Sequence, residues 1–234
     1  TIQGSPLIYY CRTHGLKLPV AQAMNDRGYD FFTLGNHDFN LGSEQLAAYL
    51  EEMKAQCLCA NVYDNQGRMK IVPSAVRVMG NGLRVGLIGI VTDWIKRWEK
   101  PQNLKGIQVN DPFEAAKKEA LRMRGQVDVL IGIYHGGMEK DLETGRRLSE
   151  TNENIACRLC EELPFDLLLT GHQHQAFSGA EWAGTWIVQP PANAEAYLKI
   201  QMDQSRKFTS ELCKVPDYAE LTPEEEFLYK DLNR

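Results

Sequence analysis

Four of the five histidines of this 234-residue chain lie in glycine-containing loops that follow runs of apolar residues. They are His37, His135, His172 and His174. Divalent transition metals accept neutral imidazole nitrogen, and a pair of such metals is a common centre for hydrolytic chemistry. A single loop histidine can equally be an ordinary turn or core residue, but the gathering of four in three loops favours a metal centre.

The neighbours of these histidines have matching chemistry. His172 and His174 are two positions apart in a turn, so one stretch of backbone can direct two imidazoles to neighbouring positions. Asn36 offers a neutral oxygen ligand, and Asp38 can orient the ring of His37 through a ring N–H. These residue types predict a site that holds metal ions and handles protons.

Apolar strands alternate with helical segments around these loops. We predict helices at 18–28, 43–55, 111–124 and 152–162, and strands at 29–34, 57–62, 75–79, 83–91, 127–133, 165–170, 186–188, 196–202 and 208–215. Asn81-Gly82 indicates a two-residue hairpin turn. This alternation with a strand-rich end predicts a mixed α/β sheet covered by helices. Because open α/β sheets bind ligands at the carboxyl ends of their strands, the three loops should meet at one edge.

Composition excludes several classes of protein. Lys and Arg number 26 against 31 Asp and Glu, and the net charge of −5 argues against a surface for nucleic-acid polymers. No apolar run approaches the roughly 20 residues of a membrane-spanning helix. Six cysteines are too few for a disulfide scaffold, so we expect free, mostly buried thiols.

Two tryptophans lie outside the histidine loops. Trp94 and Trp98 are four residues apart, with Lys96, Arg97 and Lys100 among and after them. This pattern fits either the mouth of a substrate site or a helix that packs against the domain.

Three strings, in this order, resemble the calcineurin-like metallophosphoesterases, and within them the 5′-nucleotidase and 2′,3′-cyclic-nucleotide 2′-phosphodiesterase family. They are GNHDF at 35–39, YHGG at 134–137 and TGHQH at 170–174. The stretch TNEN at 151–154 also resembles bacterial members. Each string alone is weak evidence, whereas the ordered triple is specific.

The resemblance implies an α/β fold, a layered α/β/β/α sandwich with mixed β-sheets. It implies a catalytic domain over residues 1–215, and a tail or linker over 216–234 that leads to a C-terminal nucleotide-binding domain in the parent chain. The family's Asp-x-His motif does not occur in the expected place in this sequence, so we expect it upstream, together with a metal-bridging Asp.

The resemblance also implies a set of ligands. Asn36, His135 and His172 would bind one divalent ion and His174 a second, with Mn, Zn, Fe, Co and Ca as candidates. The two ions would share a hydroxide that attacks phosphorus in line.

His37, paired with Asp38, would stabilise the phosphoryl transition state or protonate the leaving oxygen. The implied reaction is hydrolysis of 5′-nucleotides, 2′,3′-cyclic nucleotides or both, with a small-molecule nucleotide as substrate. A UDP-sugar hydrolase and a binding module that has lost catalysis are the alternatives. Family members work in the cell envelope or outside the cell, while free cysteines also suit a cytoplasm.

Overall fold

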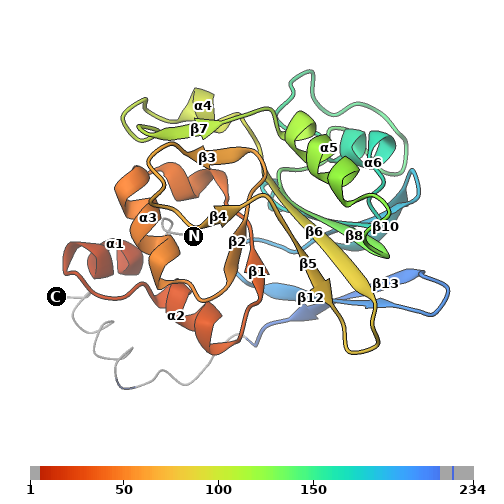
Figure 1. The fold of residues 1–234 in the computed structure, drawn as a ribbon, viewed down its shortest axis with the longest axis horizontal. Coiled ribbons are helices and arrows are strands. Elements are labelled where there is room, and N and C mark those ends of the chain that lie inside the picture. Colours follow the sequence, from red (N-terminus) through yellow and green to blue (C-terminus); the bar gives the residue numbers. More distant parts are fainter. Residues whose placement is uncertain (1–5, 217–222, 224–234) are drawn as a thin grey trace.

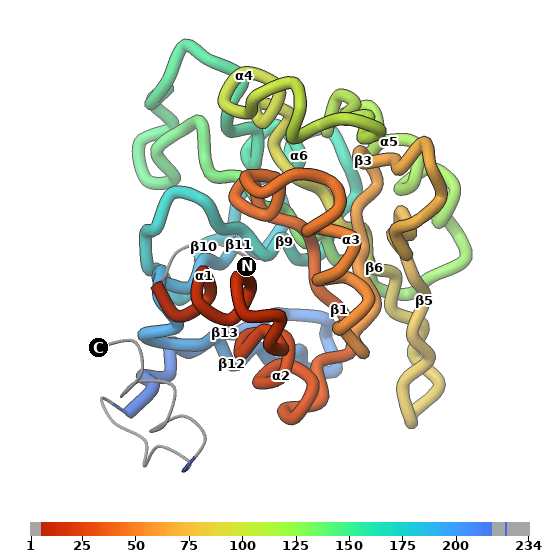
Figure 2. Tube along the Cα trace, turned by 90° about the vertical axis from the view of Figure 1, so that its left-hand side faces the viewer, coloured from red at the N-terminus to blue at the C-terminus, as the bar shows by residue number. Residues whose placement is uncertain are grey.

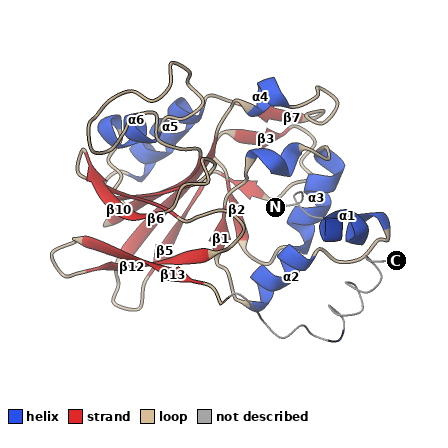
Figure 3. Cartoon of the chain, turned by 180° about the vertical axis from the view of Figure 1, so that it is seen from behind, coloured by secondary structure: helices blue, strands red, loops and turns tan. Residues whose placement is uncertain are grey.

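Two β-sheets form the centre of the molecule, and helices cover their outer faces (Figure 1). The structure is a computed structural model that describes residues 6–216 and 223. A six-stranded sheet and a three-stranded sheet contact each other, and two small two-stranded sheets accompany them. Figure 3 shows helices gathered on two sides with the strands between them. The predicted α/β class with mixed sheets is confirmed.

The smaller sheet and its helices come from the first third of the chain. The elements are α1 (Pro6–Thr13), α2 (Pro19–Asp26), β1 (Phe31–Phe32), α3 (Ser43–Glu52), β2 (Gln56–Leu58) and β4 (Ile71–Val72). The three strands are parallel, in the order β1-β2-β4. Leu46, Tyr49 and Leu50 recur at helical spacing on α3 and are buried in one core with Leu34 and Cys57. Figure 2 looks from the side of these helices, which lie in front of the strands.

The larger sheet carries most of the histidine loops. Its strands are β5 (Ser74–Val78), β6 (Arg84–Val91), β8 (Val129–His135), β9 (Leu167–Thr170), β10 (Phe177–Trp182) and β11 (Thr185–Gln189). Their order is β10-β11-β9-β8-β6-β5, with four parallel central strands and an antiparallel strand at each edge. Helices α5 (Pro112–Met123) and α6 (Ala156–Glu162) cover it through a second core that includes Ile90, Phe113 and Leu159.

The remaining elements lie outside these two sheets. They are β3 (Val62–Asp64), α4 (Ile95–Trp98), β7 (Ile107–Val109), β12 (Ala196–Met202) and β13 (Phe208–Lys214). Strands β3 and β7 pair with each other, and so do β12 and β13. The β12–β13 hairpin is attached to the large sheet where the Trp186 Nε1–H donates to Ser210 Oγ at 2.9 Å.

A glycine lets the two sheets approach each other. A Cβ at Gly89 of β6 would lie 1.9 Å from the carbonyl oxygen of Leu58 at the end of β2, which no side chain can tolerate. Two residues further on, the Ala60 N–H donates to the Gly89 carbonyl at 2.7 Å. This contact fixes the position of the small sheet, and of the loop after β1, relative to the large sheet.

Most predicted elements are confirmed, with local differences. The predicted helix at 152–162 begins only at Ala156. The predicted two-residue turn is wrong, because the Met79 N–H donates to the Leu83 carbonyl at 2.8 Å and closes a three-residue loop. Gly82 in that loop has φ 85°, so the loop follows the pattern in which a turn ends on a left-handed glycine. Helix α1 and strand β10 were not predicted.

The predicted state of the cysteines is confirmed. Cys213 is partly exposed, and the other five are buried free thiols, namely Cys11, Cys57, Cys59, Cys157 and Cys160. Within the described residues, no helix has both the length and the apolar character to cross a membrane. Residues 217–222 and 224–234 of the expected tail or linker lie outside the described part of the chain.

Candidate active site

The candidate site lies where parallel strands β8 and β9 end side by side. His135 is the last residue of β8, and His172 stands two residues beyond the end of β9. Tyr134 is in register with Thr170, which brings the two loops together. The third loop, a 3-10 turn at Asn36–Phe39, follows β1 of the small sheet and reaches the same place.

Asn36 and two histidines converge on one point. Asn36 Oδ1 is 2.8 Å from His135 Nε2 and 3.2 Å from His172 Nδ1. The two imidazole rings have centroids 5.4 Å apart and an interplanar angle of 61°. The amide oxygen and one nitrogen of each ring therefore gather around one point. Residues 99 and 136 positions from Asn36 along the chain are thus brought into contact by the fold.

His135 is held as a neutral imidazole. Burial lowers its pKa from 6.5 to about 3, and the charges of His172, His37 and His174 act in the same direction. A neutral imidazole is the form that binds a metal ion. Close approach to this ring depends on Gly35, where a Cβ would lie 2.9 Å from His135 Cε1.

His172 is held from both of its ring nitrogens. Its Nε2 is 2.9 Å from Glu153 Oε1, while its Nδ1 faces Asn36. The Thr92 hydroxyl donates to the Glu153 carbonyl at 2.8 Å, which fixes that loop beside β6. Glu153 was not among the predicted site residues, although the TNEN stretch at 151–154 was the signal that contained it.

The turn that carries His172 and His174 is anchored by the residue between them. The side-chain oxygen of Gln173 accepts from the Met138 N–H at 2.8 Å, and its amide donates to the Met138 carbonyl at 2.9 Å. His172 and His174 both have positive φ, 72° and 56°. His174 is exposed and lies near enough to His135 for its charge to lower the pKa of that ring.

His37 has a partner that the sequence did not predict. Its Nδ1 is 2.7 Å from Asn40 Oδ1. Asp38 is 3% exposed, and its Oδ2 accepts from the Gly35 N–H at 2.8 Å, which closes the 3-10 turn. Asn40 therefore occupies one ring nitrogen of His37, and the pairing of His37 with Asp38 stays a prediction.

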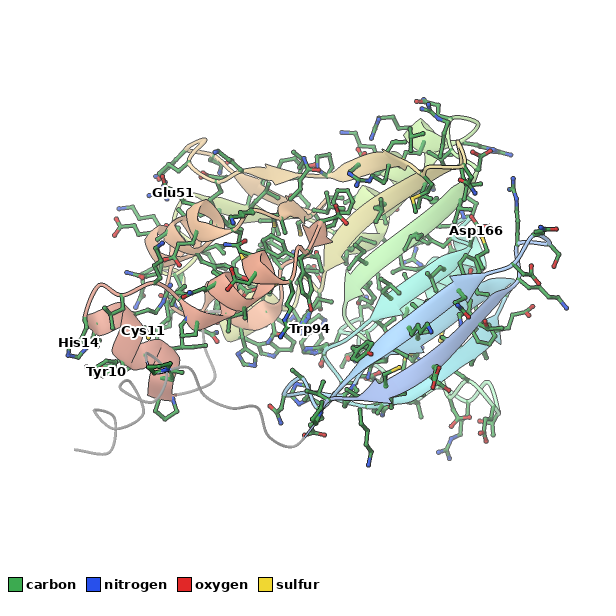
Figure 4. All side chains as sticks on the ribbon, turned by 90° about the horizontal axis from the view of Figure 1, so that it is seen from below. Tyr10, Cys11, His14, Glu51, Trp94 and Asp166 are labelled. Atoms are coloured by element: carbon green, nitrogen blue, oxygen red, sulfur yellow. The ribbon has the colours of Figure 1, made fainter. Side chains whose placement is uncertain are left out.

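Trp98 borders the site. Its ring centroid is 5.5 Å from that of His172, and the residue is 43% exposed. Trp94 lies next to it, with ring centroids 6.0 Å apart, and Figure 4 shows Trp94 between the helical half and the large sheet. Helix α4 packs against the domain through the buried Ile95, and Trp98 lies beside His172, so both interpretations of this pair agree with the structure. The fifth histidine, His14, lies at the outer edge of the molecule and stacks on Tyr10.

The donor set fits a divalent transition metal in type. In residues 6–216 and 223, no group of three or more His, Cys, Asp or Glu side chains could hold a metal ion, so the donors at this point are two imidazoles and one amide oxygen. Their separations of 2.8 and 3.2 Å match those of neighbouring ligands around an ion with bonds of about 2.0–2.1 Å. Three neutral donors leave further coordination positions open.

The sequence model of the calcineurin-like phosphoesterase family matches residues 8–176. The chain belongs to this family. The match contains Asn36, His135 and His172, and the resemblance seen in the three loops is confirmed.

Two relatives are named as phosphoesterases of nucleotides. The chain is 32% identical over 206 residues to the trifunctional nucleotide phosphoesterase protein YfkN of Bacillus subtilis (strain 168). It is 34% identical over 197 residues to the 2′,3′-cyclic-nucleotide 2′-phosphodiesterase/3′-nucleotidase of Salmonella typhimurium. Each match covers 78% of this chain, but 13% and 30% of those proteins, so the chain spans less than a third of their length.

A solved structure shows the same fold. The chain superposes with a TM-score of 0.86 and 30% identity on a Staphylococcus aureus protein described as a 5′-nucleotidase. The superposition covers 99% of this chain and 47% of that one. The layered architecture implied by the resemblance is therefore confirmed.

Proposed function

We propose that this protein hydrolyses nucleotide phosphoesters, either 5′-nucleotides or 2′,3′-cyclic nucleotides, at the site around Asn36. The observation that carries the proposal is the convergence of His135 and His172 on the amide oxygen of Asn36. The names of the relatives supply the class of substrate. The predicted nucleotide-binding domain, which would recognise the base, stays a prediction.

Enzymes of this family generally use two metal ions. Asn36, His135 and His172 would hold one ion and His174 would help to hold the other. Bound ions supply neutralisation of the phosphate charge and a hydroxide at neutral pH. The protein's part is to hold its ligands ready: burial keeps His135 neutral, and the contact with Glu153 fixes the orientation of the His172 ring.

His37 is the proton-handling group in this proposal. Its Nδ1 lies 2.7 Å from Asn40 Oδ1, which fixes the orientation of the ring. A protonated His37 ring can pass a proton to the leaving oxygen or stabilise the charge that develops on the phosphoryl oxygens. Trp98, exposed beside His172, offers an aromatic surface to the part of the substrate that leaves.

Activity assays with metal removal and replacement test the proposal. The protein, treated with a chelator and then supplied with Mn²⁺, Co²⁺ or Zn²⁺, is assayed with 5′-AMP, 2′,3′-cyclic AMP and UDP-glucose. We expect hydrolysis of at least one of the first two, lost with the chelator and restored by a metal. Turnover of UDP-glucose alone would favour the UDP-sugar hydrolase, and nucleotide binding without turnover would favour the binding module.

A further inference from the structure

The end of helix α4 and the residue after it contact the candidate site at two points. Trp98, the last residue of α4, borders His172. Glu99 lies against Asn40, the partner of His37. One oxygen of Glu99, Oε1, accepts a hydrogen bond from the Asn40 side-chain amide. Glu99 was not among the site residues predicted from the sequence.

The other oxygen of Glu99 is occupied as well. The side-chain amide of Asn103 donates to Glu99 Oε2 at 2.8 Å and to the backbone carbonyl of Asn40 at 2.9 Å. Glu99, Asn103 and Asn40 thus form a closed, partly buried set of hydrogen bonds. Hydrogen bonds that involve an ionised carboxylate are about twice as strong as neutral ones, so the set should hold Asn40 firmly.

We propose that Glu99 is a positioning residue that fixes the ring of His37 through Asn40, with the proton of the neutral imidazole on Nδ1. The inference rests on the proposed function for the catalytic role of His37. It assigns Glu99 a part in preparing that residue, at one step removed from the substrate.

The chemistry of the three groups fixes the direction of each hydrogen bond. An ionised carboxylate only accepts, so Asn40 must turn its NH₂ group toward Glu99. The side-chain oxygen of Asn40, Oδ1, then faces His37, and this oxygen too can only accept a hydrogen bond. His37 Nδ1, 2.7 Å away, must therefore carry the proton. This sequence of constraints assigns the tautomer from donors and acceptors alone.

Without Glu99, nothing in this set decides between the two orientations of the Asn40 amide. A flipped amide would present NH₂ to His37, and Nδ1 would have to be bare to accept from it. The proton of the neutral ring would then be on Nε2, so the two ring nitrogens would exchange their roles as hydrogen-bond donor and acceptor. Outer partners that set the tautomer of a functional histidine have effects on activity of about 10- to 100-fold.

Nitrogen-15 NMR of the histidine rings tests the proposal directly. At a pH where the imidazole is neutral, we expect His37 to be protonated at Nδ1, with its signal assigned by comparison with His37→Ala. In Glu99→Gln the new amide can both donate and accept, so a second population protonated at Nε2 should appear. Glu143→Gln removes one negative charge from an exposed turn and should leave the His37 signal unchanged. A single Nδ1 tautomer in Glu99→Gln would overturn the proposal.

A double-mutant cycle tests whether Glu99 acts through Asn40. Glu99→Gln should lower kcat by about 10-fold and change KM little, because the substrate does not contact Glu99. Asn40→Ala removes the side chain that links Glu99 to His37. In that background Glu99→Gln should lower kcat by less than about a further twofold. Equal effects of Glu99→Gln in both backgrounds would show that it acts by another route. If the protein hydrolyses no nucleotide, the proposed function fails, and the NMR result still decides the role of Glu99.

Discussion

Glu153 Oε1 lies 2.9 Å from Nε2 of His172, while the other nitrogen of that ring faces Asn36. A carboxylate in this position accepts a hydrogen bond from the Nε2–H group and leaves Nδ1 as the nitrogen that can bind a metal ion. Such outer carboxylates orient histidine ligands and make them more basic. The site thus contains one acidic support for a ligand, Glu153, and a separate acidic residue, Glu99, on the side of His37.

Replacing Glu153 with Gln should weaken the binding of a divalent ion by about 10- to 100-fold. The neutral amide oxygen accepts a weaker hydrogen bond from His172 than the carboxylate does, and it brings no negative charge. Isothermal titration with Mn²⁺ or Zn²⁺ measures this without any assay of activity. Glu150→Gln, an exposed neighbour whose carboxylate pairs with Arg147, is the matched control and should bind as the wild type does. Unchanged affinity in Glu153→Gln would show that this carboxylate does not support a ligand.

Replacing His37 with Ala should lower turnover by about 10²- to 10⁴-fold, the range for loss of a general acid or base. Metal content should stay the same, because Nδ1 of His37 is directed to Asn40 and not to the Asn36 cluster. Turnover and metal per chain are measured on the same preparations. A variant that loses metal together with activity would identify His37 as a ligand.

The meeting of the loops after β8 and β9 could be predicted from the sequence because it follows from a simple rule. His135 and His172 end neighbouring parallel strands, and the carboxyl ends of such strands lie at one edge of the sheet. The third loop follows β1 of the small sheet and reaches the site through the packing of the two sheets. The partners of these histidines could not be found from that rule. Asn40 and Glu99 are 59 positions apart and both lie outside strands and α-helices, where no periodic pattern indicates a contact.

Two local errors in the predicted secondary structure have physical causes. The predicted helix at 152–162 starts late because Glu153 contacts His172 and Asn154 Oδ1 accepts from the Gly137 N–H at 2.7 Å, which holds both residues in a loop. Strand β10 was missed because its register shifts between Phe177 and Ala180, so the alternation of apolar and polar residues is broken.

His172 and His174 are expected to support different ions of one centre. His172→Ala and His174→Ala should therefore each lower turnover by at least about 10³-fold, and the double variant should be little worse, because residues that act as a unit are strongly non-additive. Rates of the two single variants and the double variant, measured at saturating metal, form the test. Single variants that keep most of the activity would refute the two-ion assignment.

Burial of the cysteine thiols should make the protein sensitive to alkaline pH. Burial raises the pKa of Cys59, Cys157 and Cys160 from 9.0 to about 12. Between these values the folded chain keeps thiol protons that the unfolded chain loses. The unfolded state then binds fewer protons, so the free energy of unfolding decreases as pH rises, by at most about 1.4 kcal/mol per pH unit for each thiol. Their stabilising contribution is complete below pH 9.0 and is lost as pH rises toward about 12.

Urea denaturation of Cys160→Ala at neutral and alkaline pH measures this effect. The variant should be less stable than the wild type at neutral pH, because a buried side chain is shortened, and yet lose less stability between pH 9 and pH 11. Cys213→Ala, at a partly exposed position on β13, should follow the pH dependence of the wild type. The comparison between variants removes the contribution of other titrating groups that they share. If Cys160→Ala and the wild type lost the same stability over this range, the thiol of Cys160 would not be held protonated by burial.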